Sequence, residues 1–392
     1  MERPKGRLGK KNTLTKYKKI YSILISIVFI LFVGEISIMN LVKKDDLISV
    51  QENRSLQQKP EFSVENLING DFTKEYSTYM SDQFPMRNTW IKLKTNLDLK
   101  LGKNEINNVF IGRDNYLLED FKEESVDETK EKTDVINEFA EKYKDLNISF
   151  MLVPTATKIW EDKLPKYAPV DDELKYISQV KNNLNENVKF INVYDALYEN
   201  KDDYIYYKTD HHWTSEGAYI AYKEMCRQLG LKAKEENDFN INEVSNSFYG
   251  SLYSKLGAGI GDPDSINVYL PKKDADVVVN YVNAGEKVAS LYNTKSLEEQ
   301  DKYQVFTGGN HPLINIKSLA DPKKKLLVIK DSYANSFLPF LTAHYGEIYV
   351  VDLRYYTDNI DDLIKTDDIT DVLFLYNAAT FNEDKSILNI VD

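Results

Sequence analysis

Cysteine is almost absent from this chain of 392 residues, in which Cys226 is the single example. One thiol cannot form an intrachain disulfide, and it cannot build a cysteine-rich cluster around a structural metal ion. Histidine is also scarce, with four residues. The sequence shows no internal repeat, no low-complexity tract and no glycine-rich loop of the kind that binds nucleotides or coenzyme A. We therefore expect neither a bound metal nor a cofactor.

Positive charge is missing from most of the chain and concentrated at its start. Of 50 basic and 62 acidic residues, eight basic residues and one acidic residue lie within positions 1–19, which leaves 42 basic and 61 acidic residues elsewhere. A body this acidic repels phosphate groups, and it has no basic stripe. The sequence therefore predicts no nucleic-acid binding.

The longest apolar stretch follows this basic segment. Residues 20–34 carry no charge, and apolar character continues to residue 42, which gives about 34 Å of helix at ~1.5 Å per residue. Glu35 lies beyond the uncharged run, near the far membrane interface. The excess of basic residues before the stretch predicts a cytoplasmic N-terminus. A cleaved signal peptide is the alternative, although no clear cleavage site of small residues is present.

This pattern predicts the organisation of the whole chain. A membrane protein with a single pass is expected, with its larger part outside the cytoplasm. The predicted parts are a cytoplasmic basic tail (1–19), a transmembrane signal anchor (20–42), a polar juxtamembrane stalk (43–66) and an extracytoplasmic domain (67–392).

Short apolar strands alternate with helical segments in the second half of the chain. This alternation indicates an α/β fold of three layers, α/β/α, with a parallel sheet covered on both faces. Ligands bind such sheets at the carboxyl ends of the strands. The predicted strands are 147–154, 188–194, 325–330, 347–353 and 371–377.

The densest group of reactive side chains is Asp210-His211-His212-Trp213, directly before a helix that Thr214 is expected to cap. In extended backbone, Asp210 and His212 project to the same side and His211 points away. A carboxylate beside an imidazole is the arrangement that activates a hydroxyl. The alternative for His212 is a buried histidine without a chemical role. Since adjacent side chains are expected on opposite sides, this segment predicts no metal site.

The matching nucleophile is predicted to be Ser332, which follows an apolar strand and a tight turn in LLVIKDSYANSF. This position places the serine oxygen at the carboxyl end of a strand, with the first N–H groups of a helix free to bind an oxyanion. The alternative is that Ser332 only caps this helix. In Gly308-Gly309-Asn310-His311, the paired glycines allow close approach of the backbone, and Gly309 and Asn310 are candidate oxyanion donors. The alternative for Asn310 is a turn residue.

Together, D-H-H-W, G-G-N-H and the later D-S resemble the DHHW family and the AlgJ/AlgX-type alginate O-acetyltransferases, which are SGNH-hydrolase-like proteins. Three further motifs also resemble that pattern: Glu52-Asn53-Arg54, Asp82-Gln83-Phe84-Pro85 and Phe110-Ile111-Gly112-Arg113-Asp114. The resemblance covers about residues 50–380 and implies an SGNH-hydrolase-like fold. Carried over by motif, Asp210 orients, His212 is the base and Ser332 is the nucleophile. One departure is Lys330, which stands where SGNH hydrolases usually have a glycine before Asp-Ser.

The resemblance implies a serine O-acyltransferase, with acetyl as the expected group, that modifies an exopolysaccharide or cell-wall glycan. Its expected partners are the polysaccharide acceptor and a multi-spanning membrane acyltransferase that supplies the acyl group. The candidate substrate-binding residues are His211, Trp213, His311 and Tyr333. An esterase with the same three residues is an alternative, as is a polysaccharide-binding or assembly protein without catalysis.

The predicted topology can be tested on intact cells or protoplasts. Protease added from outside should digest residues 60–392, because the basic tail holds the N-terminus in the cytoplasm. Fragments detected by antibodies against the tail and against the C-terminus provide the measurement. Protection of the C-terminal part in sealed cells, with digestion after lysis, would contradict this topology.

Overall fold

The computed structural model describes residues 7–49, 54–257 and 259–390. Residues 1–6 of the predicted basic tail and Glu52-Asn53 of the motif lie outside the described residues. By its internal contacts the chain forms two compact units, Met1–Lys94 and Thr95–Asp392. This division does not test the predicted boundaries after residues 19, 42 and 66, which stay predictions.

The first unit is built around one long helix, α1 (Arg7–Val42). Its segment Tyr17–Val42 is long and apolar enough to cross a membrane by length and composition, and it is the one such helix among the described residues. Apolar side chains from Ile20 to Val42 are mostly exposed, as expected of a helix that lacks a protein core to pack on. The unit's other elements are β1 (Ile48–Ser49), β2 (Arg54–Ser55), α2 (Val64–Ile68), α3 (Asp71–Asp82) and the start of α4 (Arg87–Lys100).

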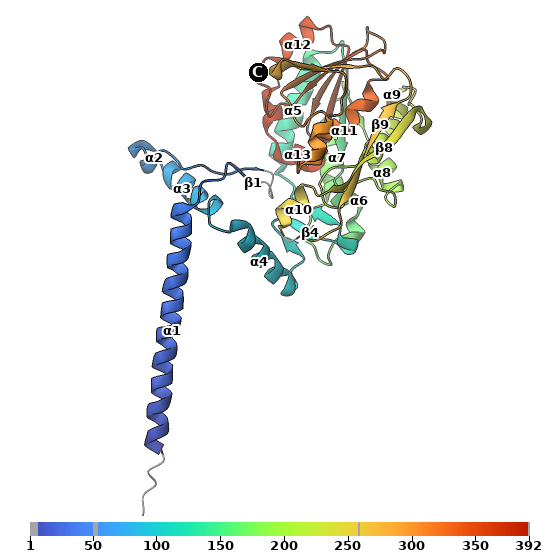
Figure 1. Ribbon diagram of the computed structural model, residues 1–392. Coiled ribbons are helices and arrows are strands. Elements are labelled where there is room, and N and C mark those ends of the chain that lie inside the picture. Colours follow the sequence, from blue (N-terminus) through green and yellow to red (C-terminus); the bar gives the residue numbers. More distant parts are fainter. Residues whose placement is uncertain (1–6, 50–53, 258, 391–392) are drawn as a thin grey trace, which may run out of the picture. The chain divides into compact units, whose positions relative to one another are not determined.

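The second unit is organised by a large twisted sheet (Figure 1). This sheet has eight strands in the order β11-β10-β12-β14-β13-β15-β6-β7. Its parallel part contains β14 (Glu347–Val351), β13 (Lys325–Lys330), β15 (Asp371–Asn377), β6 (Asn147–Val153) and β7 (Val188–Ile191). These are the five strands that the sequence predicts. The predicted α/β fold class is thus confirmed.

Three antiparallel strands extend the sheet beyond β14, and they were not predicted from the sequence. They are β10 (Val278–Tyr281), β11 (Glu286–Val288) and β12 (Leu313–Lys317). All three are short, and the sheet edge that they form is half-solvated, so they lack the continuous apolar run of a strand that is buried on both faces.

Alternate residues along the central strands enter two separate cores, which makes the three layers. Leu326 and Val328 of β13 belong to one core, while Leu327 and Ile329 belong to the other. The first core includes α6 (Ala156–Ile159), α8 (Tyr194–Glu199), α9 (Ser215–Leu229) and α11 (Ala334–Leu341). The second includes α5 (Val126–Lys142), α7 (Glu173–Asn183), α12 (Ile360–Thr366) and α13 (Ala378–Glu383).

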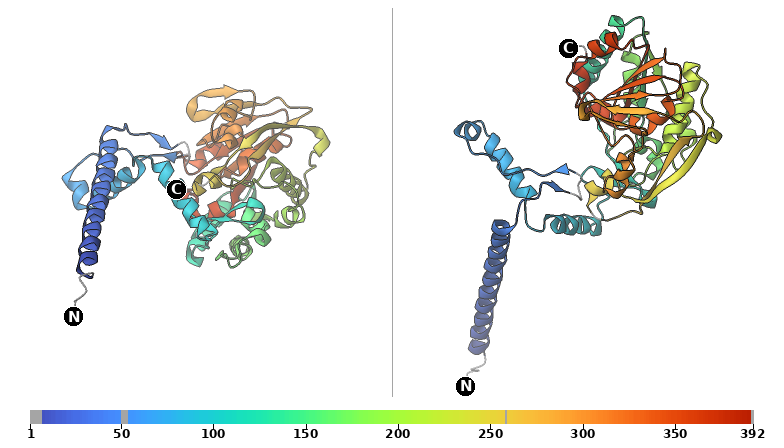
Figure 2. Two further views of the ribbon diagram at one scale, coloured as in Figure 1. Left: turned by 60° about the horizontal axis from the view of Figure 1, so that its bottom comes forward. Right: turned by 45° about the horizontal axis from the view of Figure 1, so that its top comes forward.

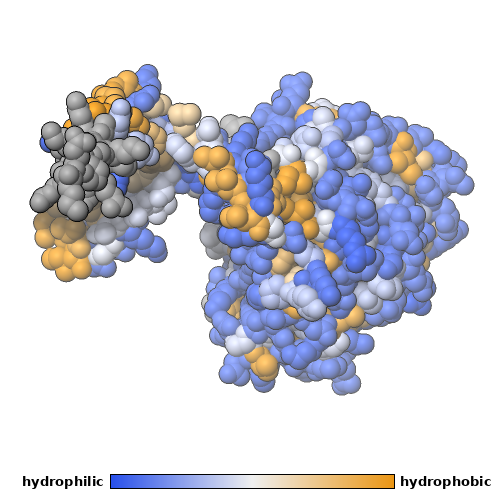
Figure 3. Space-filling view, turned by 90° about the horizontal axis from the view of Figure 1, so that it is seen from below, coloured by the Kyte–Doolittle hydropathy of each residue, from blue (hydrophilic) through white to orange (hydrophobic). Residues whose placement is uncertain are grey.

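Two smaller β elements lie outside the sheet. The antiparallel strands β3 (Glu105–Ile106), β4 (Val109–Ile111) and β5 (Leu117–Glu119) form a small sheet, with Gly112 in the connection between β4 and β5. The second element is a long antiparallel ribbon, β8 (Phe239–Phe248) with β9 (Asp264–Pro271) (Figure 2). A short helix, α10 (Ser251–Leu256), lies between β8 and β9 in the chain. The face of the larger unit in Figure 3 is mainly hydrophilic, with a few small groups of apolar residues.

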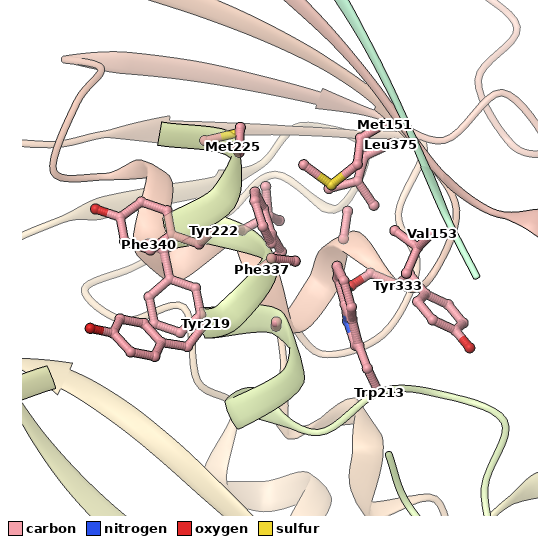
Figure 4. Packing of buried hydrophobic residues seen from close by; sticks show 14 of the residues in the cluster. Met151, Val153, Trp213, Tyr219, Tyr222, Met225, Tyr333, Phe337, Phe340 and Leu375 are labelled. Carbon is pink, nitrogen blue, oxygen red and sulfur yellow. The ribbon is translucent and has the colours of Figure 1, made fainter. Parts of the chain in front are cut away.

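Aromatic side chains dominate the contact between α9 and α11, where Tyr219 and Tyr222 meet Phe337 and Phe340 (Figure 4). The Tyr222 hydroxyl lies 2.7 Å from His344 Nε2, and the buried thiol of Cys226 lies 3.7 Å from the same nitrogen. Burial, with smaller contributions from two nearby lysines, lowers the pKa of His344 to about 4. His344 is therefore neutral in the folded chain at pH 7.

Acidification should lower the free energy of unfolding, because His344 is harder to protonate in the folded chain than in the unfolded chain. Its folded pKa of about 4 lies below the unfolded value of 6.5, so the unfolded chain binds one more proton between these pH values and the free energy of unfolding falls as pH drops. We expect wild type to lose about 2 kcal/mol more than His344→Gln between pH 7 and pH 4.5. Urea unfolding of both full-length proteins in detergent measures the difference, and equal losses would contradict the prediction.

Candidate active site

The Asp210–Trp213 segment is held in place from both sides. It leads into α9, where Thr214 Oγ1 accepts a hydrogen bond from Gly217 N–H and Gly230 ends the helix in a left-handed conformation. On the other side, the carboxylate of Asp264 accepts hydrogen bonds from the backbone N–H groups of Lys208 and Thr209, both at 2.8 Å. It also accepts bonds from the hydroxyls of Thr209 and Tyr204. Asp264 thus fixes the backbone immediately before Asp210.

The structure brings Asp210, His212 and Ser332 into one chain of hydrogen bonds. His212 Nδ1 lies 2.5 Å from Asp210 Oδ1, and His212 Nε2 lies 2.8 Å from Ser332 Oγ. Asp210 also accepts from the backbone N–H of His212 at 2.9 Å and from that of Ser251 at 2.7 Å. Asp210 and His212 are buried, and Ser332 is partly exposed.

The charge of Asp210 decides which nitrogen of His212 carries the proton. Burial works against ionisation of Asp210, but the adjacent His212 and His211 and the hydrogen bonds prevail and lower the pKa of Asp210. An ionised carboxylate is only an acceptor, so His212 Nδ1 must donate to it. In the neutral ring, Nε2 then holds a lone pair that faces the Ser332 hydroxyl.

Ser332 is positioned by a turn at the carboxyl end of β13. The carboxylate of Asp331 accepts hydrogen bonds from Tyr333 N–H at 2.9 Å and from Asn377 N–H, at the end of the neighbouring strand β15, at 2.8 Å. Burial raises the pKa of Asp331, and these backbone bonds oppose that effect. Ser332 Oγ bonds to His212 and does not cap α11, which begins at Ala334 without a side-chain cap.

The helix N–H groups expected to bind an oxyanion have other acceptors in the structure. Tyr333 N–H donates to the Asp331 carboxylate, Ala334 N–H to the Asp331 carbonyl and Asn335 N–H to the Ser332 carbonyl. The expectation of free donors at this helix start is therefore corrected, because the turn bends the chain so that its own oxygens satisfy them. In the described part of the chain, the backbone N–H of Ser332 itself donates to no acceptor.

Aromatic rings enclose the imidazole of His212. Tyr303 stacks on it with centroids 3.7 Å apart and planes at 10°, and its hydroxyl donates to the Ser332 carbonyl at 3.1 Å. Tyr333 and Trp213 are fully buried beneath the site, and Trp213 Nε1–H donates to the Tyr333 carbonyl (Figure 4). Both residues are substrate-binding candidates from sequence, but complete burial makes them part of the support under the site.

His211 lies beside His212, which corrects the expectation that it points away. The two ring centroids are 3.8 Å apart, and His211 Nδ1 lies 2.6 Å from Ser251 Oγ. The segment bends at these residues, so the alternation of an extended strand does not apply. Ligand atoms of Asp210, His211 and His212 consequently lie within 4.8 Å of one another, as in a metal site. Hydrogen bonds to Ser251, to Ser332 and between Asp210 and His212 already engage the three side chains.

The glycine-rich segment before β12 is bonded through Asn310 to Lys330 and Asn335, which lie on either side of Ser332 in the chain. Asn310 Oδ1 accepts hydrogen bonds from Lys330 Nζ at 2.8 Å and from Asn335 Nδ2 at 3.2 Å. Gly309 N–H instead donates to the Phe306 carbonyl at 3.3 Å, so this oxyanion candidate already has an acceptor.

His311 turns toward a neighbouring pocket of about 310 Å³. Its Nε2 lies 3.1 Å from the Thr307 carbonyl, and its ring centroid lies 4.5 Å from that of Tyr281. Burial lowers the pKa of His311. Asn293 and Gly308 also line this pocket, which adjoins the segment that carries Asn310.

Three residues of the site were not predicted from the sequence: Tyr303, Asp264 and Ser251. Tyr303 stacks on His212 from 91 positions away in the chain and lies in a polar stretch without a motif. Asp264 and Ser251 reach the loop from the start of β9 and the start of α10. A Gly-Asp-Pro-Asp turn precedes β9, but such turns are common, so this signal points to no particular partner.

The α/β fold, together with a serine, a histidine and an aspartate that are hydrogen-bonded to one another, defines the class of protein to which this chain can be compared. The family model described as "DHHW protein" matches residues 92–351, about two thirds of the sequence. The chain therefore belongs to the DHHW family. No curated protein sequence matches it.

Solved structures support the fold. A DHHW family protein from Eubacterium siraeum is 26% identical, with 72% of this chain and 95% of that chain covered and a TM-score of 0.63. Bacillus cereus PatB1, solved with a sulfonyl adduct, is 22% identical, with coverage of 72% and 97% and a TM-score of 0.62. The O-acetyltransferase domain of Pseudomonas putida AlgJ is more distant, at 15% identity, coverage of 71% and 93% and a TM-score of 0.44.

Gly250 can be used to test the packing around Asp210. A Cβ atom at this position would lie 2.2 Å from Asp210 Cβ and 2.4 Å from Oδ2. Gly250→Ala should therefore lower the free energy of unfolding by about 2–4 kcal/mol, measured by urea unfolding. The control Gly285→Ala meets no atom within 4 Å but has a φ of +65°, so about 1 kcal/mol is expected from backbone strain alone. Similar losses for both variants would contradict the tight fit.

Proposed function

We propose that this chain is a membrane-anchored serine O-acyltransferase that works outside the cytoplasm on an exopolysaccharide or cell-wall glycan, with acetyl as the transferred group. The observation that carries the proposal is the pair of contacts at His212, 2.5 Å to Asp210 and 2.8 Å to Ser332. These distances are those of a nucleophile, a general base and an orienting acid. Asp210, His212 and Ser332 are the proposed catalytic triad.

The reaction proceeds by double displacement. Ser332 Oγ attacks the carbonyl carbon of the acyl donor while His212 Nε2 takes the hydroxyl proton, and the protonated His212 then gives this proton to the leaving group. A sugar hydroxyl next attacks the acyl-serine and passes its proton to His212. Cleavage of the ester returns that proton to Ser332 Oγ, which restores the starting state.

Both tetrahedral intermediates place a negative charge on the former carbonyl oxygen. The backbone N–H of Ser332 and the side-chain amide of Asn310 are the proposed donors to this oxyanion. Donors held in place before the reaction stabilise the developing charge without a cost of reorganisation. The buried surroundings of His212 strengthen these electrostatic interactions further.

Two features favour transfer to a sugar over a role without chemistry. The sequence resembles AlgJ/AlgX-type O-acetyltransferases in the same motifs that form the hydrogen-bonded chain. PatB1, which has the same fold, is described with a sulfonyl adduct, and sulfonyl reagents attach to activated nucleophiles. A multi-spanning acyltransferase as the source of acyl groups and α1 as a single-pass anchor with a cytoplasmic N-terminus complete the proposal.

A simple esterase is the remaining catalytic candidate, because water can replace the sugar hydroxyl without any change in the triad. The partly exposed Ser332 admits either acceptor. A binding or assembly protein is the candidate of another class. It has no need for the hydrogen-bonded serine, so chemical reactivity at Ser332 separates it from both enzymes.

Reactivity at Ser332 is the decisive test. The full-length protein in detergent, incubated with 4-nitrophenyl acetate, should gain one acetyl group at Ser332, detected by mass spectrometry. Ser332→Ala should abolish this adduct, and His212→Ala and Asp210→Asn should each slow it at least ~100-fold, because an unassisted hydroxyl is a weak nucleophile. The control is Ser215→Ala, whose hydroxyl donates to the Asn267 carbonyl and should not matter for the rate.

Adding short oligosaccharides distinguishes the two enzymes. Transfer yields acetylated sugar, whereas hydrolysis yields free acetate at an unchanged rate. If wild type and Ser332→Ala acquire acetyl groups alike, the catalytic proposal fails and the binding protein remains.

A further inference from the structure

Lys330 is a fully buried cation directly before the Asp331-Ser332 turn. Its side chain is 0% exposed. Its ammonium group donates to Asn310 Oδ1 and Asn335 Oδ1, each at 2.8 Å, and reaches Asp352 Oδ2 at 3.4 Å. The three N–H groups of the ammonium therefore meet three oxygen atoms. Because a buried charge that loses a partner is strongly destabilising, these contacts hold Lys330, Asn310 and Asn335 together.

The ammonium group fixes how both asparagine side chains are turned. A lysine ammonium has donors and no acceptor, so each amide must present its oxygen to it. Asn335 Nδ2 then faces Asn310 Oδ1, at 3.2 Å, as its second donor. Because Lys330 and Asn335 both donate to the side-chain oxygen of Asn310, its Nδ2 points away from these two buried residues. Asn310 is itself exposed, unlike Lys330 and Asn335.

The backbone before Asn310 does not by itself fix the orientation of the Asn310 side chain. Three consecutive residues before it, Thr307, Gly308 and Gly309, have left-handed φ values of 60°, 70° and 98°. A threonine in this conformation is strained, and two glycines add freedom to the chain. Without a tether, a segment of this kind samples many orientations of the residue that follows it.

The carboxylates of Asp352 and Asp331 favour the charged form of Lys330. Asp352 is also 0% exposed, and Arg354 donates to both of its oxygens at 2.8 and 2.6 Å. Burial is the main influence that lowers the pKa of Lys330 to about 8, Arg354 adds to it, and Asp352 and Asp331 oppose it. The side chain is thus mainly an ammonium group at pH 7.

We infer that Lys330 is a positioning residue of acyl transfer, which holds Asn310 so that its amide N–H groups face the oxyanion formed at Ser332. This inference rests on the proposed function and deepens it. Lys330 stands where SGNH hydrolases usually have glycine, and it performs a task that glycine cannot. It orients the donor on the Thr307–Asn310 segment from beneath, without touching the substrate.

A double-mutant cycle tests this role with the full-length protein in detergent and 4-nitrophenyl acetate as the probe. Asn310→Ala should slow acetylation of Ser332 about 100-fold, as loss of one oxyanion donor does. Lys330→Met removes the ammonium at similar length and should slow it at least ~10-fold, with KM nearly unchanged, since the amide donor acts mainly on the transition state. The double variant should be no slower than Asn310→Ala within about threefold, because Lys330 acts through Asn310.

Lys132→Met is the matched control for loss of a buried ammonium. Lys132 is 1% exposed and bonds to the Glu124 carboxylate and to the carbonyls of Phe381 and Asn382, on the side of the sheet covered by α5. It should lose stability but keep the acetylation rate within about twofold of wild type, since no bond links it to Asn310. If Lys330→Met does not fold, Asn335→Ala replaces it. This variant removes the other donor to Asn310 Oδ1 and should show the same non-additivity with Asn310→Ala.

The outcomes separate the two proposals. Wild-type rates in Lys330→Met, or a double variant slowed by the product of the single effects, would overturn the role of Lys330 and leave the acyltransferase proposal intact. Failure of wild type to acquire an acetyl group at Ser332 would overturn both.

Discussion

The carboxylate of Asp331 is the constraint on which the geometry of the site depends. One of its oxygens holds the backbone just after Ser332, and the other holds the end of β15, the neighbouring parallel strand. Because this side chain is fully buried, no water competes for these bonds. The serine turn is thereby attached to two central strands at once. This rigid support holds Ser332 Oγ at 2.8 Å from His212 Nε2.

His212 is restrained in a different way, by the faces and edges of rings. Tyr303 covers one face at 3.7 Å, and His211 lies against the ring at a tilt. With Asp210 on one nitrogen and Ser332 on the other, the imidazole has almost no room to rotate. As the proposed general base, His212 would not have to be ordered during the reaction, which is how positioning contributes to rate.

The sequence predicted those parts of the molecule that depend on neighbours in the chain. Five buried strands were visible as apolar runs, and Asp210 and His212 as a pair two residues apart. Contacts between distant residues left no such pattern: Tyr303 on His212, Asp264 under Thr209 and the oxygens around Lys330 come from separate elements. The direction of His211 was wrong because the backbone bends there, and β10 to β12 were missed because short strands at a half-solvated edge lack an apolar run.

The place of β15 in the sheet has a consequence for the timing of assembly. Among the described residues this strand is the last, yet it lies between β13, which carries the serine turn, and β6. Synthesis therefore delivers the histidine loop first, the serine turn about 120 residues later, and β15, whose Asn377 N–H donates to the Asp331 carboxylate, after both. Long-range pairing of this kind is a late event in folding. A chain made only as far as α11 thus lacks the bond from Asn377 N–H to the Asp331 carboxylate, so the serine turn is fully fixed only after β15 has been added.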